Sequence, residues 1–424
     1  MRQFLSASSG SQFRRNFVRV ARANVLALAL PVAATPLLSR LFTPNDFAAL
    51  AIFTSALSLA YAFCTWRFDW SLPNARTRMI AANLMALGAM VLGVVCVATV
   101  MLLLFAADAL FSETLGRLGY LAYLFPIALL GGGAKQLLSG WFVREGDLTA
   151  VSRATISQSL YNTALSILAG FASLGGLGLI GSTVVSTWAG IVMMMRLSAG
   201  RLHGALRRVT LFTLRVAVRR FGREATWSTL VAILNAVSLA APVLLLAYYF
   251  PHKEVGWYAL LYRLLAAPIG VLSSALGQSF WSTAADLARS RRVAELNALY
   301  KKTTLRLCLA AIPLILGCLA GPFLVGPILG EAEWGGAGYV LVAMTPLFVG
   351  SLIFGPTNHL VVFSRQSLQT LVDGIRLVLV ALSIVLGHAA GLSFTNVVAL
   401  ASFSSLLGYA AFYPLHLRIH AQHG

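Results

Sequence analysis

The chain has 424 residues, of which 58% are hydrophobic and 11% are charged, whereas soluble globular proteins carry about 25% charged residues. This composition excludes an ordinary soluble domain. A formal net charge of +19 is compatible with nucleic-acid binding, so the placement of the charges along the chain decides what it means.

Apolar runs of about 18 or more residues recur from one end of the chain to the other, and each could cross a bilayer as one helix. We therefore predict an all-α integral membrane protein with about twelve transmembrane helices. The runs lie near residues 18–41, 46–66, 80–107, 120–143, 155–175, 177–197, 227–250, 255–280, 304–327, 337–361, 371–390 and 395–416.

Arginine and lysine are unequally distributed among the connections between these runs. With the N-terminus inside, the cytoplasmic segments hold 27 of them, and the outer loops hold only Arg40, Arg117 and Lys253. The positive-inside rule then predicts that both termini are cytoplasmic. We interpret the basic charge as a topology signal that attracts anionic membrane lipid, and we expect no nucleic-acid partner.

The longest connection divides the chain into two halves. We predict an N-terminal six-helix lobe at residues 1–197, a basic cytoplasmic linker at 198–226 and a C-terminal six-helix lobe at 227–424. Apolar side chains recur in the linker at helical spacing, at Leu211, Leu214, Val218 and Phe221. This pattern is typical of an amphipathic helix on the inner membrane surface. A simple tether whose arginines set the topology explains the same charges equally well.

Matching segments open the two halves. "FTPNDFAALA" (Phe42–Ala51) and "YFPHKEVGWYAL" (Tyr249–Leu260) each join the first and second runs of their half, which suggests a parallel internal repeat. In the first segment we expect Thr43 to cap the helix that begins at Pro44, with Asp46 as its partner.

Other motifs are informative by their absence from the sequence. The connections are short and contain no GxxxxGK[ST] phosphate loop, so we expect no ATP hydrolysis. The four cysteines lie inside apolar runs without the spacing of a metal site, so we expect neither a metal nor a cofactor.

The fourth and eighth runs each contain a cation away from their ends. Lys135 shares a helical face with Ala128, Gly131 and Ser139. The neighbouring glycines, Gly131–Gly133, would loosen this helix or let another backbone approach it.

In the eighth run, the face of Arg263 also carries small residues, namely Gly256, Ala259, Ala267, Gly270, Ser274 and Gly277. A charged side chain at the bilayer centre costs at least about 2.5–3.5 kcal/mol. Small residues face other helices or a cavity, so Arg263 is predicted to point into the protein.

All thirteen acidic residues lie in loops or at the ends of runs, so neither cation has a central acid to neutralise it. Each cation could cap a neighbouring helix or pair with a carbonyl group. Two such cations, one in each half, favour a cationic cavity that binds an anionic cargo, with Arg263 and Lys135 as its ligands. Secondary candidates for this site are Arg22, Arg67, Asp69, Gln278, Asn358 and His359.

Four segments together resemble the polysaccharide flippase branch of the multidrug/oligosaccharidyl-lipid/polysaccharide exporter superfamily. They are "PLLSRLFTPNDFAALAIF" (Pro36–Phe53), "RFDWSLPNARTRMIAANLMAL" (Arg67–Leu87), "GWYALLYRLLAAPIGVLSSALGQSFW" (Gly256–Trp281) and "NHLVVFSRQSLQTLVDGIRLVLV" (Asn358–Val380). Ala48 and Asp69 replace the glycine and glutamate that are usual in the family, and Lys135 has no family counterpart that we can assign.

The resemblance implies a V-shaped, alternating-access transporter with two six-helix lobes, and not an enzyme. It implies a cargo of undecaprenyl-pyrophosphate-linked oligosaccharide, moved to the outer leaflet of a bacterial inner membrane for O-antigen, capsule or exopolysaccharide synthesis. A polysaccharide polymerase and chain-length proteins would be its partners. Two alternatives stay open, a multidrug exporter of the same superfamily and a membrane glycosyltransferase or polymerase.

Overall fold

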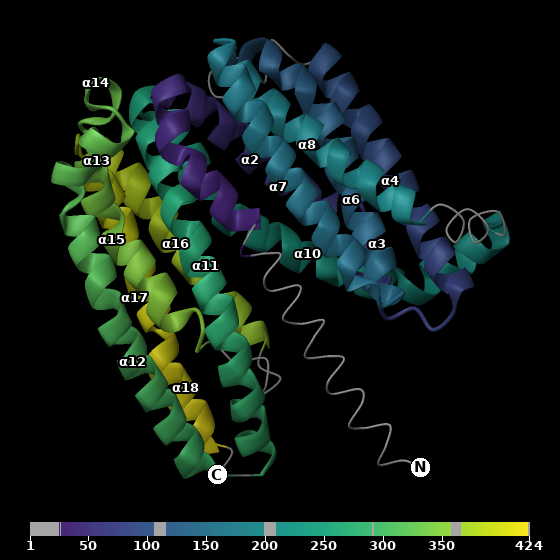
Figure 1. The fold of residues 1–424 in the computed structure, drawn as a ribbon. Coiled ribbons are helices and arrows are strands. Elements are labelled where there is room, and N and C mark those ends of the chain that lie inside the picture. Colours follow the sequence, from purple (N-terminus) through teal and green to yellow (C-terminus); the bar gives the residue numbers. More distant parts are fainter. Residues whose placement is uncertain are drawn as a thin grey trace. The chain divides into compact units, whose positions relative to one another are not determined.

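The computed structural model describes residue 25 and residues 27–105, 116–198, 209–290, 292–357 and 366–422, which form helices and no strand (Figure 1). A first apolar helix spans Ala27–Leu41. The elements that follow are α2 (Pro44–Phe63), α3 (Phe68–Ser71), α4 (Arg78–Phe105), the 3₁₀ helix η1 (Gly116–Leu124), α6 (Phe125–Arg144), α7 (Leu148–Phe171), α8 (Gly175–Ser198), α10 (Leu211–Tyr249), α11 (His252–Arg289), α12 (Val293–Leu319), α13 (Gly321–Leu329), α14 (Glu331–Trp334), α15 (Ala337–Phe354), α16 (Gln366–Ala389), α17 (Phe394–Ala410) and α18 (Phe412–Gln422).

Within these described ranges, ten helices are long and apolar enough to cross a membrane. The two other predicted spans fall on Ala27–Leu41, which is shorter, and on α7, which has 24 residues but is not among the ten. Since the described part of every predicted run is mainly helical, the prediction of an all-α, multi-pass membrane protein is confirmed.

The chain packs as two compact units. The first unit comprises Met1–Ala34 and Ile52–Val237, and the second comprises Thr35–Ala51 and Ser238–Gly424. The division passes through α2 and α10, so each of these helices contributes one part to each unit.

Three consecutive glycines of α6 organise the packing of the first unit. A Cβ atom at Gly132 would collide with the phenol of Tyr61 on α2. A Cβ at Gly133 would come within 2.5 Å of Leu92 on α4, and one at Gly131 within 3.1 Å of Trp188 on α8. The glycines therefore let side chains of three neighbouring helices approach the backbone of α6, which stays helical from Phe125 to Arg144.

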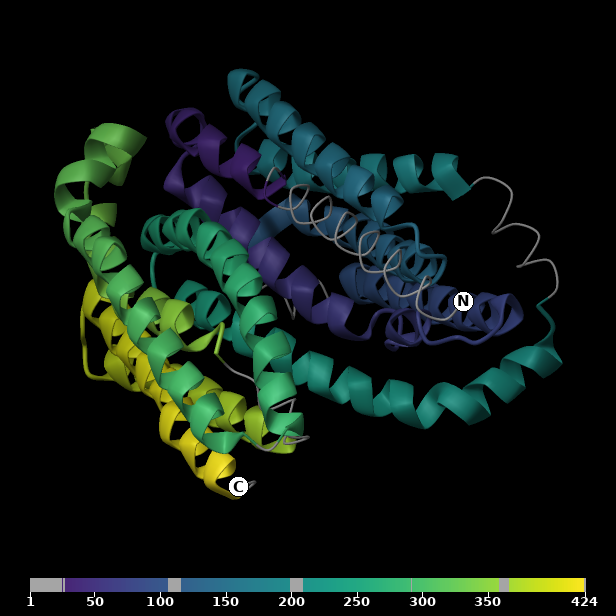
Figure 2. The same cartoon turned by 60° about the horizontal axis from the view of Figure 1, so that its bottom comes forward.

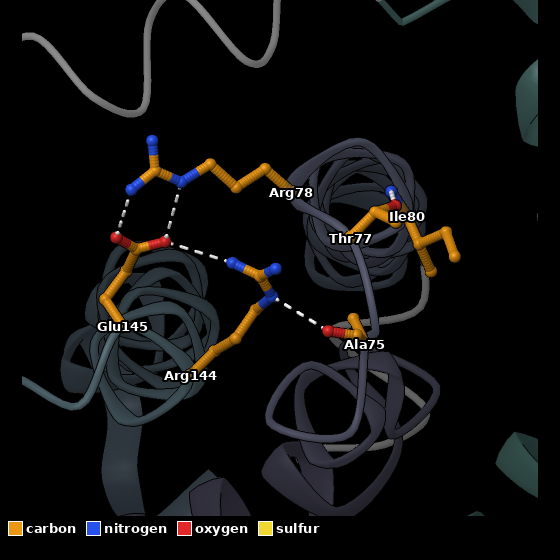
Figure 3. A network of polar contacts seen from close by, with 6 residues as sticks. All are labelled: Ala75, Thr77, Arg78, Ile80, Arg144 and Glu145. Atoms are coloured by element: carbon orange, nitrogen blue, oxygen red, sulfur yellow. Dashed lines mark hydrogen bonds and ion pairs between the residues drawn. The ribbon is translucent and has the colours of Figure 1, made fainter.

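An ion-pair network joins the start of α4 to the end of α6 (Figure 3). Glu145 lies 3.0 Å from Arg78 and 3.0 Å from Arg144, and Arg144 also donates a hydrogen bond to the carbonyl oxygen of Ala75. Thr77 caps α4 by accepting a hydrogen bond from the backbone N–H of Ile80. Together these contacts fix the connection between α3 and α4 against α6.

The basic segment before the seventh predicted span is helical from Leu211 onward and continues without a break into that span as α10 (Figure 2). Leu214 and Ala217 are buried in the core of the first unit, whereas Leu211 is 84% exposed. Thr213 donates a hydrogen bond to Asn83 of α4, which attaches this end of α10 to the first unit. The buried face of this end of α10 therefore shares Leu214 with the apolar stripe seen in the sequence, but it includes Ala217 and leaves Leu211 exposed.

In the second unit, the start of α2 packs against the start of α11. The backbone N–H of Asp46 donates to the Thr43 hydroxyl at 3.4 Å, and the Asp46 carboxylate accepts from the backbone N–H of Thr43 at 2.9 Å, so the predicted cap is confirmed. A Cβ at Gly256 would overlap the carbonyl group of Pro44. The two matching segments identified in the sequence thus lie against each other, and glycine allows their close approach.

Candidate functional site

A cavity of about 810 Å³ lies inside the first unit and is lined by α2, α3, α6, α7 and α8. Small-molecule sites in proteins usually measure about 300–1,000 Å³. The lining residues are mostly small or polar: Thr54, Leu57, Ser58, Tyr61, Arg67, Asp69, Trp70, Pro73, Asn74, Ala128, Gly132, Lys135, Gln136, Ser139, Gly140, Val143, Gln158, Thr183, Val184 and Thr187.

Lys135 reaches this cavity from α6. Its ammonium group donates a hydrogen bond to the side-chain oxygen of Gln158 on α7. The amide nitrogen of Gln158 donates to the hydroxyl of Thr187 on α8 at 3.0 Å, which fixes the orientation of the amide. Lys135 forms no ion pair with any carboxylate of the described residues, so its positive charge is solvated by an amide and is not neutralised.

Arg67 reaches the same cavity from the turn before α3. Trp66 and Arg67 both adopt left-handed backbone conformations, with φ of 49° and 53°. A non-glycine residue in this conformation costs about 1–3 kcal/mol, a strain that is common at functional sites. The Arg67 guanidinium lies 4.9 Å from the centre of the Trp70 ring, and its buried Nε has no hydrogen-bond partner among the described residues.

Asp69 is the single carboxylate among the residues that line this cavity. It is 9% exposed and accepts a hydrogen bond of 2.6 Å from the hydroxyl of Thr65. The lining therefore carries two cations, Lys135 and Arg67, against one carboxylate. Because these charges lie in a protein interior of low dielectric constant, the cavity is suited to an anion that also forms many hydrogen bonds.

Arg263 belongs to α11 in the second unit and is partly buried. It forms neither an ion pair nor a hydrogen bond with any described residue. A cavity of about 580 Å³ in this unit is lined by Tyr262, Ala266, Gly270 and Gly277 of α11, among others, but not by Arg263. One residue corresponds to a rotation of about 100° around a helix, so Arg263 lies beside the cavity-lining stripe.

The structure therefore brings three of the sequence candidates together, Lys135, Arg67 and Asp69. Gln278 lies on α11 of the second unit, where only its main chain is described. Arg22, Asn358 and His359 lie outside the described residues.

Several lining residues were not among the candidates from the sequence, notably Tyr61, Trp70, Gln136 and Gln158. One pattern could have revealed Gln158. It shares a face of α7 with Asn162, four residues on, and two amides at that spacing are unusual in an apolar helix. Asn162 accepts a hydrogen bond of 3.4 Å from Thr183, another lining residue.

Arg376 of α16 in the second unit already has its partners. Its guanidinium lies 3.3 Å from the carboxylate of Asp373 and 4.3 Å from the centre of the Tyr409 ring. It lines a small cavity of about 80 Å³ with Tyr258 and Tyr262. This arginine is neutralised within its own unit, unlike Lys135.

The sequence profile of a family described as "Polysaccharide biosynthesis protein" matches residues 37–337. No curated protein has a significant match to the sequence. Three solved structures show the same fold at low sequence identity, and at such identities the likeness establishes the fold alone.

The first is a multidrug resistance MATE family transporter of the MOP superfamily in an inward-facing conformation. It matches with a TM-score of 0.65 and 14% identity over 94% of this chain and 96% of its own. The second is the lipid II flippase MurJ in an inward closed conformation, with a TM-score of 0.66 and 12% identity over 96% of this chain and 87% of its own. The third is a MOP superfamily transporter from Pyrococcus furiosus, with a TM-score of 0.56 and 14% identity over 96% of each chain.

Proposed function

This chain belongs to the polysaccharide biosynthesis protein family, and we propose that it flips undecaprenyl-pyrophosphate-linked oligosaccharide from the cytoplasmic to the periplasmic leaflet of a bacterial inner membrane. The oligosaccharide would serve the synthesis of O-antigen, capsule or exopolysaccharide. A polymerase and chain-length proteins would act on it afterwards. The fold is that of membrane transporters and flippases, one of which is described as a lipid II flippase.

The observation that carries this proposal is the state of the two cations inside the predicted spans. Neither Arg263 nor Lys135 forms an ion pair with a described residue, although charge in an apolar span costs at least about 2.5–3.5 kcal/mol. A bound anion would offset part of that free-energy cost. The pyrophosphate group of the cargo is such an anion, and it cannot cross hydrocarbon without a charged partner.

We assign the pyrophosphate to Arg263, because a guanidinium group donates two parallel hydrogen bonds that match phosphate oxygens. The cavity around Lys135 takes part of the attached sugar head, while the lipid tail stays in the bilayer. Exposure of the bound head first to one side and then to the other completes the transfer. No covalent chemistry is needed.

A multidrug exporter of organic cations fits the site less well. Binding a cation at membrane depth requires a carboxylate that is available to it. In the cavity of the first unit the one carboxylate, Asp69, is buried and accepts a hydrogen bond from Thr65, and it is outnumbered by two cations. The likeness to a MATE family transporter supports a shared fold and carries no information on the cargo.

A membrane glycosyltransferase or polymerase is also less well supported. Its usual reaction requires two catalytic carboxylates or a metal site. Within the described ranges, no group of three or more His, Cys, Asp or Glu residues could hold a metal ion.

The test is transport by the purified protein in vesicles that contain a fluorescent lipid-pyrophosphate-oligosaccharide, with an impermeant quencher reporting the outer leaflet. We expect Arg263→Ala to insert normally and to lose at least about 100-fold in flipping rate, because it removes the cation in the span. Arg219→Ala is the matched control, since this exposed arginine of α10 lines neither of the two larger cavities. Full activity of the Arg263→Ala protein, or failure of the wild type to flip the lipid, would refute the proposal.

A further inference from the structure

We infer that the cavity of the first unit is a subsite for an acidic sugar, so that the glycan of the cargo carries a carboxylated pyranose such as a uronic acid. This inference rests on the proposed flippase function and extends it to the class of sugar that is transported.

Lys135 has hydrogen-bond donors that no described residue uses. A lysine ammonium group carries three N–H donors, and the structure assigns one of them to Gln158. Gln158 cannot turn away, because Thr187 binds its amide nitrogen at 3.0 Å. Two donors of an ammonium group without a carboxylate partner among the described residues therefore remain for a ligand inside the cavity. A single compact carboxylate suits such a point charge.

Several neutral hydrogen-bonding groups line the same cavity as Lys135. The side chains of Asn74 and Ser139 have no hydrogen-bond partner among the described residues, and both line the cavity. The amide nitrogen of Gln136 is likewise unused, although its oxygen lies 3.8 Å from the thiol of Cys64. Hydroxyl-rich molecules need many such neutral groups, whereas a pyrophosphate mainly needs cations.

An aromatic side chain lines the same cavity as the lysine. Trp70 is 63% exposed, although it is a large apolar side chain that lines a cavity. Arg67, held in a strained left-handed turn, places its guanidinium 4.9 Å from the ring centre. The guanidinium lies over one face of the indole, and the exposed remainder is an apolar surface on which the C–H face of a pyranose ring can stack. Asn74 lines the same cavity and adds a polar group for the ring hydroxyls.

Arg67 is poorly placed to take a pyrophosphate by itself. Its guanidinium is stacked on Trp70 and its Nε is buried, so the parallel fork that phosphate prefers is not fully exposed. The cavity of about 810 Å³ is also larger than one phosphate group requires. Size, charge and lining together favour a sugar with one carboxylate.

The experiment uses the purified full chain in lipid nanodiscs and follows tryptophan fluorescence and thermal unfolding. The probes are trigalacturonate, the neutral trisaccharide maltotriose and inorganic pyrophosphate, each titrated into the millimolar range. We expect trigalacturonate to bind at least about tenfold more tightly than maltotriose. Lys135→Gln should abolish this preference, and Trp70→Ala should weaken the binding of both sugars. Lys301→Gln, which removes an exposed lysine of α12, should change neither.

Equal affinity for the two trisaccharides, or no binding to the folded wild type, would overturn the inference. Lys135-dependent competition between pyrophosphate and trigalacturonate would also overturn it, because the cavity would then be a phosphate site. If Lys135→Gln does not fold, Lys135→Arg keeps the charge and must keep the preference for the acidic sugar. The proposed function fails separately: in that case trigalacturonate still binds, but the wild type does not flip the lipid-linked cargo.

Discussion

The two units each enclose a cavity next to a helix that carries small residues and one cation, yet the two cavities differ in chemistry. In the first unit, Lys135 and the small residues of α6 face the same cavity of about 810 Å³. In the second unit, one face of α11 lines a cavity of about 580 Å³, and Arg263 is not among the residues of that face. That second cavity is lined by aliphatic, aromatic and small residues. Its hydroxyl groups come from two serines and two tyrosines, and no charged residue lines it. Similar sequence patterns in the two halves therefore do not imply similar binding sites.

A second contrast concerns neutralisation of charge. Arg376 in the second unit has Asp373 as an ion-pair partner and Tyr409 beneath its guanidinium. Lys135 in the first unit has only the neutral amide of Gln158. A cation that is already paired stabilises the fold, whereas an unpaired one is available for a ligand. We therefore propose that the hydrogen-bonding part of the chemistry lies in the first unit.

Charge reversal in the first cavity tests this contrast with the largest expected effect. Lys135→Glu changes a lining of two cations and one carboxylate into one cation and two carboxylates. Two like charges at 4 Å repel by about 4 kcal/mol at an effective dielectric constant of 20, so we expect flipping in vesicles to fall by at least about 100-fold. Lys301→Glu, at an exposed position of α12, is the matched control. Wild-type flipping by the Lys135→Glu protein would remove the first cavity from the mechanism.

A pair of glycine substitutions tests how closely side chains pack around one lining glycine in each cavity. A Cβ at Gly132 in the first unit would overlap the Tyr61 phenol, whereas a Cβ at Gly270 in the second unit meets no atom within 4 Å. We expect Gly132→Ala to destabilise the protein by about 1–3 kcal/mol through overpacking. Gly270→Ala should stabilise α11 by up to about 1 kcal/mol, because alanine is the better helix former. Thermal unfolding in detergent measures both, and equal shifts would contradict the difference in packing.

Two ion pairs, one in each unit, extend the comparison, and the exposed one gives the smallest expected loss of stability. Arg144 is largely buried, and its removal takes away the bond to Ala75 and one of the two arginine partners of Glu145 (Figure 3). We expect Arg144→Ala to cost about 1–3 kcal/mol in unfolding free energy. The pair Arg292–Glu295 in the second unit is exposed, so Arg292→Ala should change stability by less than about 1 kcal/mol. Chemical denaturation of the two variants decides this, and a larger loss for Arg292→Ala would reverse the ranking.

Much of the fold could be predicted because membrane helices follow from composition and local chemistry. The apolar runs are long enough to fix the helices, since a polar backbone in lipid must satisfy its own hydrogen bonds. The cap of α2 at Thr43 and Asp46 also follows from local sequence, because its partners are three residues apart. The exception is α10, where Ala217 is buried with Leu214 while Leu211 is exposed, a combination that periodicity alone did not identify.

The candidate site was less predictable, because its partners come from different helices. Lys135 meets Gln158, 23 residues away, and Gln158 meets Thr187, a further 29 residues along the chain. Arg67 reaches the cavity because it and Trp66 both adopt the left-handed backbone conformation, which non-glycine residues seldom adopt. No local pattern contains these arrangements.

By itself, then, the sequence determined that this is a helical membrane protein, where its helices run and which cations lie inside its spans. Hydrophobic length and charge bias are properties of contiguous segments, so they can be counted along the chain. The tertiary structure decided which of those cations shares a cavity with amides, hydroxyls and an exposed indole. That depends on the rotation of each helix about its axis, where a shift of one residue, about 100°, takes Arg263 out of the cavity-lining stripe that its neighbours form.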